Sequence, residues 1–258
     1  MGHFLYSVFL IHLKNKTNTL KNKNSILILI ISLAFFIFLF SSYNYQETIL
    51  SYEVNPKKQE IKLYFKNDKN ENLKSILNLK KYLELKNQKL VFATNGGMYK
   101  KDNSPVGLFI QNNKLITPLD TTSGNGNFYL KPNGVFYLSD KKEGFISKTE
   151  NYKNNKDIKF ATQSGPMLVI DNEINSVFNK SSSNINIRSG VGILPNGNVL
   201  FGMSNSEINF YNFAEFFKKR GCKNALYLDG FVSRTYCPEK NNEQVDGDFG
   251  VIIGITRK

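Results

Sequence analysis

Four short segments of the sequence place polar side chains and glycine directly beside apolar runs, and these are the places where chemistry could be carried out. They are Thr94–Tyr99, Thr162–Gly165, Ile187–Gly190 and Leu228–Gly230. Glycine next to a buried strand allows backbone N–H groups to approach a ligand closely. Taken alone, each segment could equally be a tight turn, a polar loop or the site of a structural salt bridge.

Arg188 and Asp229 carry the most specific chemistry in these segments. The chain contains 30 Lys and only 4 Arg. An Arg at the head of a strand therefore suggests a need for the planar guanidinium, which grips phosphate or carboxylate through two parallel hydrogen bonds. Asp229 follows four apolar residues that predict a buried strand. A carboxylate there can act as a nucleophile or activate water, or it can simply cap the loop through backbone N–H groups.

The two histidines exclude several classes of catalytic site. His3 and His12 both precede an apolar run that starts at Ile26, and the rest of the chain contains no histidine. A Ser-His-Asp triad, a Cys-His pair, a His-based zinc site and a non-haem iron triad are therefore not expected. Catalysis must then use carboxylates, amides, hydroxyls, Arg and Lys. We expect no cofactor, and a divalent cation at Asp229 or Asp102 stays open.

The net positive charge is weak evidence for a particular binding partner. Lys and Arg outnumber Asp and Glu by 34 to 21, which gives a net charge of +13. The excess comes from Lys in a chain that is also rich in Asn, a bias that often reflects coding composition. We expect no nucleic-acid partner, and a general affinity for anionic surfaces is more plausible.

The run from Ile26 to Phe40 is almost wholly apolar and predicts a membrane segment. Lys14, Lys16, Lys21 and Lys23 precede it, and no acidic residue occurs before Glu47. Under the positive-inside rule, residues 1–24 are cytoplasmic, residues 25–43 form a transmembrane signal anchor, and residues 44–258 form a periplasmic or extracellular domain. The run is slightly short for a span, and a cleaved signal peptide is the alternative.

Cys222 and Cys237 bracket the Asp229 segment. Outside the cytoplasm a disulfide bond between them could persist. Two unpaired, buried thiols are the alternative, and the sequence does not decide between the two.

The elements that must position these residues are mostly strands. Apolar spacing predicts amphipathic helices over residues 71–86 and 209–220. Hairpins are predicted around Asn112-Asn113, around Lys131–Gly134 and around Pro195–Gly197, and residues 139–158 are expected to form a polar surface excursion. We expect one sheet-rich α+β domain with mixed or antiparallel strands and a few flanking helices.

The four segments, taken in order with the strands and helix between them, are more specific than any one of them. N-G-G-M-Y, S-P-V-G-L, Q-S-G-P-M-L, R-S-G-V-G-I and L-D-G occur in that order. Over residues 60–257 the chain thereby resembles the phosphodiester glycosidase family. The resemblance implies catalytic roles for Asn95, Arg188 and Asp229. It implies substrate contacts from a second set of residues: Gly96, Gly97, Tyr99, Gln163, Ser164, Ser233 and Arg234.

One position departs from the family pattern. The family often has D-G-G-x-S where this chain has Asp229-Gly230-Phe231-Val232-Ser233. We expect Phe231 to narrow the pocket and to alter the choice of substrate.

The resemblance implies a hydrolase that cleaves a sugar–phosphodiester linkage in envelope or exported glycans. Phosphate is already a good leaving group, so one well-placed carboxylate with Arg stabilisation is sufficient where ordinary glycosidases need two carboxylates. The alternative is a non-catalytic protein that binds an anionic glycan and assists exopolysaccharide or envelope assembly. A peptidase or esterase is disfavoured because histidine is missing after residue 12.

Overall fold

The computed structural model describes residues 30–32, 49–230 and 232–257, and the chain divides into two units, residues 1–47 and 48–258. Within the first unit only residues 30–32 are described, and they are helical and exposed. The predicted membrane anchor therefore lies almost wholly outside the described residues. None of the helices that the structure describes has the length and apolarity needed to cross a bilayer.

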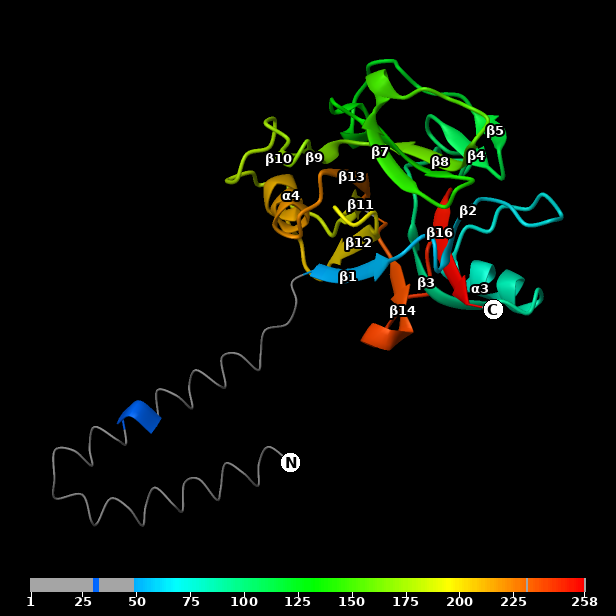
Figure 1. The fold of residues 1–258 in the computed structure, drawn as a ribbon, viewed down its shortest axis with the longest axis horizontal. Coiled ribbons are helices and arrows are strands. Elements are labelled where there is room, and N and C mark those ends of the chain that lie inside the picture. Colours follow the sequence, from blue (N-terminus) through cyan, green and yellow to red (C-terminus); the bar gives the residue numbers. More distant parts are fainter. Residues whose placement is uncertain (1–29, 33–48, 231, 258) are drawn as a thin grey trace, which may run out of the picture. The chain divides into compact units, whose positions relative to one another are not determined.

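The second unit is built from three antiparallel sheets (Figure 1), which confirms the expected sheet-rich α+β class. The strands of the first sheet, in spatial order, are β1 (Ile49–Val54), β12 (Val199–Ser204), β11 (Ser189–Ile193), β13 (Asn224–Asp229), β9 (Met167–Ile170) and β10 (Glu173–Ile174). Those of the second are β15 (Asn242–Glu243), β14 (Thr235–Cys237), β3 (Lys89–Asn95), β16 (Ile252–Arg257) and β2 (Glu60–Tyr64). Those of the third are β5 (Lys114–Thr117), β4 (Phe109–Gln111), β8 (Ile158–Ser164), β6 (Gly134–Ser139) and β7 (Gly144–Lys148).

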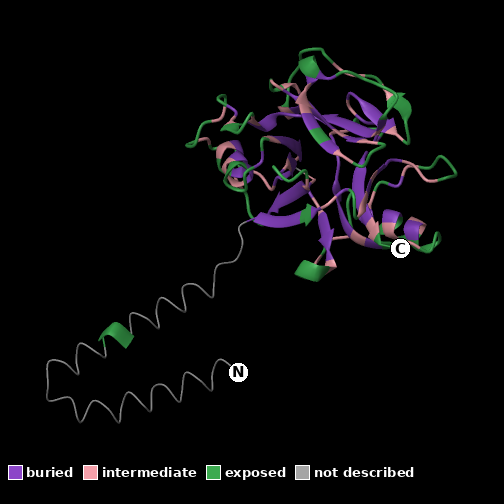
Figure 2. Ribbon diagram, in the orientation of Figure 1, coloured by how far each residue is buried: buried purple, intermediate pink, exposed green. Residues whose placement is uncertain are grey.

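The largest apolar core lies where the three sheets meet, and it appears as the buried interior in Figure 2. Phe92 of the second sheet, Phe136 of the third and Phe201 of the first are all buried in it. The rings of Phe92 and Phe201 stack with centroids 5.2 Å apart, and Phe136 meets Phe201 edge to face. Burial of such rings contributes roughly 1.5–3 kcal/mol each, so this core fixes the three sheets against one another.

Two α-helices cover the outer faces of the sheets. Helix α4 (Phe210–Lys219) begins at Asn209, whose side chain accepts a hydrogen bond from the Asn212 N–H, and it ends before Gly221, which has a φ of 84°. This confirms the predicted second helix. Helix α3 (Ile76–Glu84) is shorter than the predicted 71–86, because Lys74 has a φ of 63° and Ser75 caps the helix at residue 76.

The glycines of β11 leave room for helix α4 to pack directly against the strand. A Cβ atom added to Gly192 would lie 2.6 Å from the Cys222 sulfur and 2.9 Å from the Phe217 ring, and one added to Gly190 would crowd Phe213. The sequence R-S-G-V-G-I therefore has small residues because a helix lies directly against the strand.

Two of the three predicted hairpins are confirmed, and one is wrong. Strands β4 and β5 pair across Asn112-Asn113, and β11 and β12 pair across Pro195–Gly197. The third was predicted to pair residues 127–130 with β6. Residues 127–129 instead form a 3₁₀ helix, η2 (Asn127–Tyr129), because β7 and β8 already occupy both edges of β6.

The surface excursion predicted for residues 139–158 is partly wrong. Strand β7 lies within this region and pairs with the edge of β6. Phe145 of β7 stacks on Tyr137 of β6 with ring centroids 5.2 Å apart, which holds the strand against the sheet. Two further 3₁₀ turns, η3 (Thr149–Asn151) and η4 (Pro238–Lys240), complete the described elements.

The disulfide bond considered for Cys222 and Cys237 is not formed. Both thiols are free and buried. Cys222 packs under α4 in the core of the first sheet, whereas Cys237 ends β14 in the second sheet and faces the central core. The two residues therefore belong to different layers, which confirms the alternative of two buried thiols.

Candidate active site

Asp229 is the last residue of β13, and it lies in the first sheet opposite Ser189 of β11. The register between the two strands shifts at this point, because Ser189 pairs with Asp229 while Gly190 pairs with Tyr227. A bulge of this kind re-aims the side chains beside it. The carboxylate is partly buried, and its Oδ1 accepts a hydrogen bond of 2.6 Å from the Gly230 N–H.

Burial raises the pKa of Asp229 to about 6, and the hydrogen bond from Gly230 only partly opposes the increase. The cause is desolvation, which disfavours the charged form of a carboxyl group. A carboxyl group with this pKa changes its charge close to neutral pH. Such groups are suited to proton transfer and are a common mark of catalytic sites.

Three buried side chains hold the backbone on which Asp229 sits. Ser189 Oγ and Ser233 Oγ both donate to the Asp229 carbonyl oxygen, at 3.0 and 2.8 Å. Asn95 Nδ2 donates to Ser189 Oγ at 2.9 Å, and Asn95 Oδ1 accepts from the Arg234 N–H at 3.2 Å. The structure therefore brings together four predicted residues, Asn95, Asp229, Ser233 and Arg234, and it adds Ser189.

Arg188 is fully buried, and the protein itself occupies most of its hydrogen-bond donors. Nε donates to the Ile208 carbonyl at 2.7 Å, and Nη2 donates to the Asn184 carbonyl at 2.8 Å. The guanidinium lies flat on the Phe210 ring, 3.7 Å from its centroid. The edge formed by Nε and Nη2, which would grip a phosphate through two hydrogen bonds, is therefore already used by these carbonyl groups.

The remaining nitrogen of Arg188, Nη1, faces the hydroxyl group of Tyr227 at 3.4 Å. Burial lowers the pKa of Arg188, and within the described residues its guanidinium makes no ion pair with a carboxylate. Tyr227 lies two residues before Asp229 on the same strand. The motifs did not point to Tyr227, because in the sequence it is one residue of an apolar strand.

Gln163 and Ser164 hold neighbouring backbone. Gln163 is fully buried and its carboxamide is saturated: Oε1 accepts from the Leu108 and Asp120 N–H groups at 2.9 Å each, and Nε2 donates to the Asp120 carbonyl at 2.7 Å. Ser164 Oγ donates to the Leu228 carbonyl at 2.7 Å, directly before Asp229. Ser164 thus joins the site, while the side chain of Gln163 anchors the loop after β5.

The segment Gly96-Gly97-Met98-Tyr99 brings backbone close to β8 and β16. A Cβ atom added to Gly97 would lie 2.5 Å from both the Gln163 carbonyl and Thr162 Oγ1, and the Gly96 N–H donates to the Val251 carbonyl at 2.7 Å. Burial and the negative charges of Asp229 and Asp248 raise the pKa of Tyr99 to about 12. Tyr99 therefore lies within the electrostatic reach of Asp229.

The side chains of Arg234 and Asp102 form contacts away from Asp229. Arg234 Nε lies 2.9 Å from both carboxylate oxygens of Asp246, in a half-exposed ion pair. Asp102 is exposed, and Ser104 donates to it from both its backbone N–H and its hydroxyl group, which lowers the pKa of Asp102. Phe231 lies outside the described residues. No group of three or more potential metal ligands occurs in the part of the chain that the structure describes.

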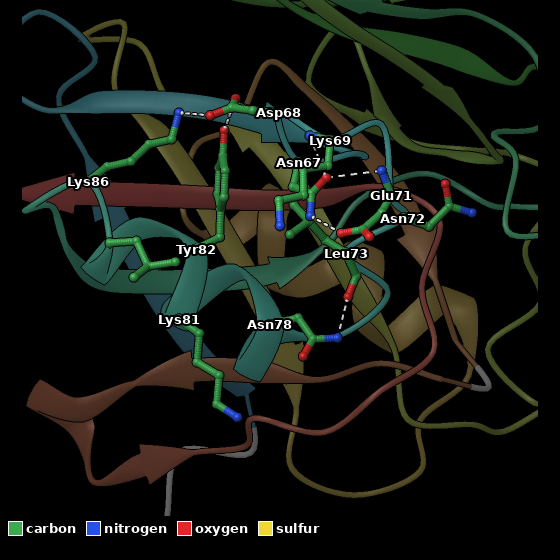
Figure 3. Close-up of a pocket in the computed structure, with 11 residues that line it drawn as sticks. Asn67, Asp68, Lys69, Glu71, Asn72, Leu73, Asn78, Lys81, Tyr82 and Lys86 are labelled. Atoms are coloured by element: carbon green, nitrogen blue, oxygen red, sulfur yellow. Dashed lines mark hydrogen bonds and ion pairs between the residues drawn. The ribbon is translucent and has the colours of Figure 1, made fainter.

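A pocket of about 610 Å³ lies between the loop after β2 and helix α3, and none of the predicted site residues lines it (Figure 3). Its polar side chains bond mainly to one another. Lys86 and Tyr82 both contact the Asp68 carboxylate, and Asn67 donates to Glu71. These internal pairs leave few groups for a ligand, so Asp229 and its surroundings remain the candidate site.

Comparisons with known proteins find a matching family and a related protein. Residues 88–255 match the phosphodiester glycosidase family. The chain is 37% identical over 190 residues to the uncharacterized protein YigE of Escherichia coli strain K12, and the match covers 73% of this chain and 74% of YigE.

Solved structures share the fold. The catalytic domain of zebrafish N-acetylglucosamine-1-phosphodiester alpha-N-acetylglucosaminidase, auto-inhibited by its pro-peptide, matches with a TM-score of 0.57 and 12% identity over 83% of this chain and 85% of that one. A putative exported protein of Burkholderia pseudomallei matches with a TM-score of 0.53 and 9% identity over 80% and 73% of the two chains. At these identities the matches show a common fold.

Proposed function

The chain belongs to the phosphodiester glycosidase family, and from this premise we propose that it hydrolyses the bond between a sugar and a phosphodiester in an envelope or exported glycan. The observation that carries the proposal is Asp229, a partly buried carboxyl group with a pKa of about 6 at the end of a central strand. The zebrafish enzyme that shares the fold is named for the same class of linkage.

The proposed reaction needs an ionised carboxylate. The bond between C1 of the sugar and the phosphate oxygen breaks, and its electron pair leaves with the phosphate. In the direct route, water attacks C1 and gives its proton to the Asp229 carboxylate. In the covalent route, Asp229 attacks C1 as the phosphate leaves, and water then breaks the bond between C1 and Asp229 and gives its proton to the released carboxylate. A carboxyl group with a pKa of about 6 is mostly ionised at neutral pH and still basic enough to take the proton.

Some of the surrounding residues hold Asp229 in place, and others lie beside the proposed position of the substrate. Asn95, Ser189 and Ser233 hold the backbone of Asp229 through the hydrogen bonds described above. We place the substrate on the side of Asp229 where Tyr99 lies, with the backbone of Gly96 and Gly97 beside it. Arg188 supports the site from within the protein rather than through a bidentate contact with phosphate.

Anchoring in the inner membrane through residues 25–43, with the domain outside the cytoplasm, is part of the proposal and rests on the sequence. The charge-free run after four lysines supports it. Alkaline phosphatase fused after residue 60 should be active in a bacterial host. An inactive fusion, together with an active cytoplasmic reporter at the same point, would contradict this topology.

The function is tested by incubating the full-length protein with a panel of sugar 1-phosphodiesters, with and without a chelator. We expect release of free sugar and a phosphomonoester from at least one member, whether or not the chelator is present. Binding of the diesters without any release would contradict hydrolysis and favour the alternative of a glycan-binding protein. Activity lost only with chelator would show that a cation is required.

A further inference from the structure

Tyr227 connects the buried charge of Arg188 to the backbone that holds Asp229. Its hydroxyl group accepts a hydrogen bond from Arg188 Nη1 at 3.4 Å, and it also makes a side-chain hydrogen bond with Asn127 of η2. The side chain is 1% exposed, and its ring packs edge to face on Phe210. The hydroxyl group is therefore fixed in one place by three elements of the fold.

The other side of this hydroxyl group faces Gly230. A Cβ atom added to Gly230 would collide with the Tyr227 oxygen, and Gly230 has no positive φ. Glycine is thus required at this position for space, since the Tyr227 hydroxyl group lies directly against the backbone. The same Gly230 donates its N–H to Oδ1 of Asp229 at 2.6 Å.

The charges nearby agree with this arrangement. Burial and the negative charge of Asp229 raise the pKa of Tyr227, whereas the charge of Arg188 opposes the increase. The hydroxyl group consequently stays protonated at neutral pH and lies within reach of both charges. Arg188 makes no ion pair among the described residues, so Tyr227 is its polar link toward the site.

We propose that Tyr227, held by Arg188, is a positioning residue for Asp229 that acts by fixing Gly230. This inference rests on the proposed function only for its readout of turnover. Loss of the hydroxyl group frees Gly230 to move, which weakens the N–H hydrogen bond that favours the charged form of Asp229. The carboxylate is then both less well placed and harder to ionise.

The test compares full-length wild-type protein with Tyr227→Phe and with Tyr64→Phe as a matched control. Tyr64 is also buried, and its hydroxyl group has no hydrogen-bond partner among the described residues. We expect Tyr227→Phe to lower kcat about tenfold per folded molecule, with KM nearly unchanged, and to move the acidic midpoint of the pH profile upward by about half a unit or more. Tyr64→Phe should behave as wild type.

A second pair of variants tests the contact itself. Gly230→Ala should lose most of its activity because the new methyl group meets the Tyr227 hydroxyl group. Tyr227→Phe combined with Gly230→Ala should be more active than Gly230→Ala alone, since the oxygen is gone. A double variant no better than Gly230→Ala, or a Tyr227→Phe variant equal to wild type, would overturn the proposal.

A protein without turnover would refute the proposed function and still leave this inference testable. The pH dependence of unfolding free energy, compared between proteins with Asp229 and with Asp229→Asn, reports the midpoint of Asp229 without any substrate. The inference predicts that this midpoint rises in the Tyr227→Phe background. An unchanged midpoint would contradict it.

Discussion

Asn95 Nδ2 donates a 2.9 Å hydrogen bond to Ser189 Oγ, and this contact joins the second sheet to the first directly behind Asp229. Both residues are almost completely buried. Ser189 passes the contact on to the Asp229 carbonyl oxygen, so the position of the carboxylate depends on how the two sheets are joined.

Asn95→Ala should therefore lower both stability and activity. The change removes the Asn95 donor to Ser189 Oγ and leaves the Arg234 N–H without its acceptor in a buried place, at a cost of about 2–3 kcal/mol of unfolding free energy. Urea unfolding and turnover per folded molecule measure the two effects. Asn154→Ala, on the surface, is the control and should change neither. Wild-type stability in the Asn95 variant would show that the contact between sheets contributes nothing.

Asp229→Asn should increase stability at neutral pH. Because the folded-state pKa is raised, the contribution of Asp229 to stability is fully present below about pH 4 and is lost as the pH rises through about 6. Asn cannot ionise and avoids this loss, which amounts to at most about 3 kcal/mol for a shift of about two units. Urea unfolding at pH 4 and pH 8 should give equal stabilities at the lower pH and a more stable variant at the higher one.

The control for this comparison is Asp157→Asn, an exposed position. It should show no such dependence on pH. A less stable Asp229→Asn variant at pH 8 would indicate that the carboxylate merely caps its loop.

Arg188→Lys should lower the unfolding free energy of the protein as well as its turnover. If Arg188 only gripped phosphate, as its place in the sequence suggests, Arg188→Lys would lower kcat/KM with little change in melting temperature. The structure changes this expectation, since Lys cannot replace the contacts with Ile208, Asn184 and the Phe210 ring together. We expect a loss of roughly 3 kcal/mol or more in unfolding free energy, the scale for a buried charge that loses the groups compensating it.

Arg220→Lys provides the matched control, because Arg220 forms a half-exposed ion pair with Glu53. It should cost about 1 kcal/mol or less. If both Lys variants were equally stable, the burial of Arg188 would have no energetic role.

The kcat/KM of the wild-type protein should rise with pH through a midpoint near 6. The sign follows from the role of Asp229, because a base or a nucleophile must be ionised to act, and ionisation increases as pH rises through the pKa. Initial rates between pH 4.5 and 8 measure the profile. A rate that falls through pH 6 would instead assign Asp229 as a proton donor.

Local patterns in the sequence predicted the parts of the fold that depend on neighbouring residues. Helix α4 and the hairpins at Asn112-Asn113 and Pro195–Gly197 follow from spacing, capping and turn residues. The pairing of β6 with β8 could not be found this way, because the paired residues are 19 to 30 positions apart in the chain. Long-range pairing, not local propensity, assigned residues 127–129 to a 3₁₀ helix.

The residues of the candidate site were also predicted only in part from the sequence. Asp229, Asn95 and Ser233 were predicted by their motifs, and the structure brings them together. The rarity of Arg188 among 30 lysines does indicate a geometric need, and carbonyl groups and an aromatic ring inside the protein take up most of its guanidinium. Its predicted catalytic role stays a prediction. Tyr227 was missed because a tyrosine in an apolar strand is indistinguishable from a core residue until its hydroxyl group is located.

The central claim is that the protein breaks the bond on the sugar side of a phosphodiester, with Asp229 as the essential carboxylate. Hydrolysis in water labelled with oxygen-18 tests it most directly, with wild type and Asp229→Asn run side by side. We predict that the label appears in the released sugar, and that Asp229→Asn, folded and at least as stable as wild type at neutral pH, loses on the order of 10²-fold or more in kcat. Label in the phosphate, or equal turnover by the Asn variant, would contradict the account.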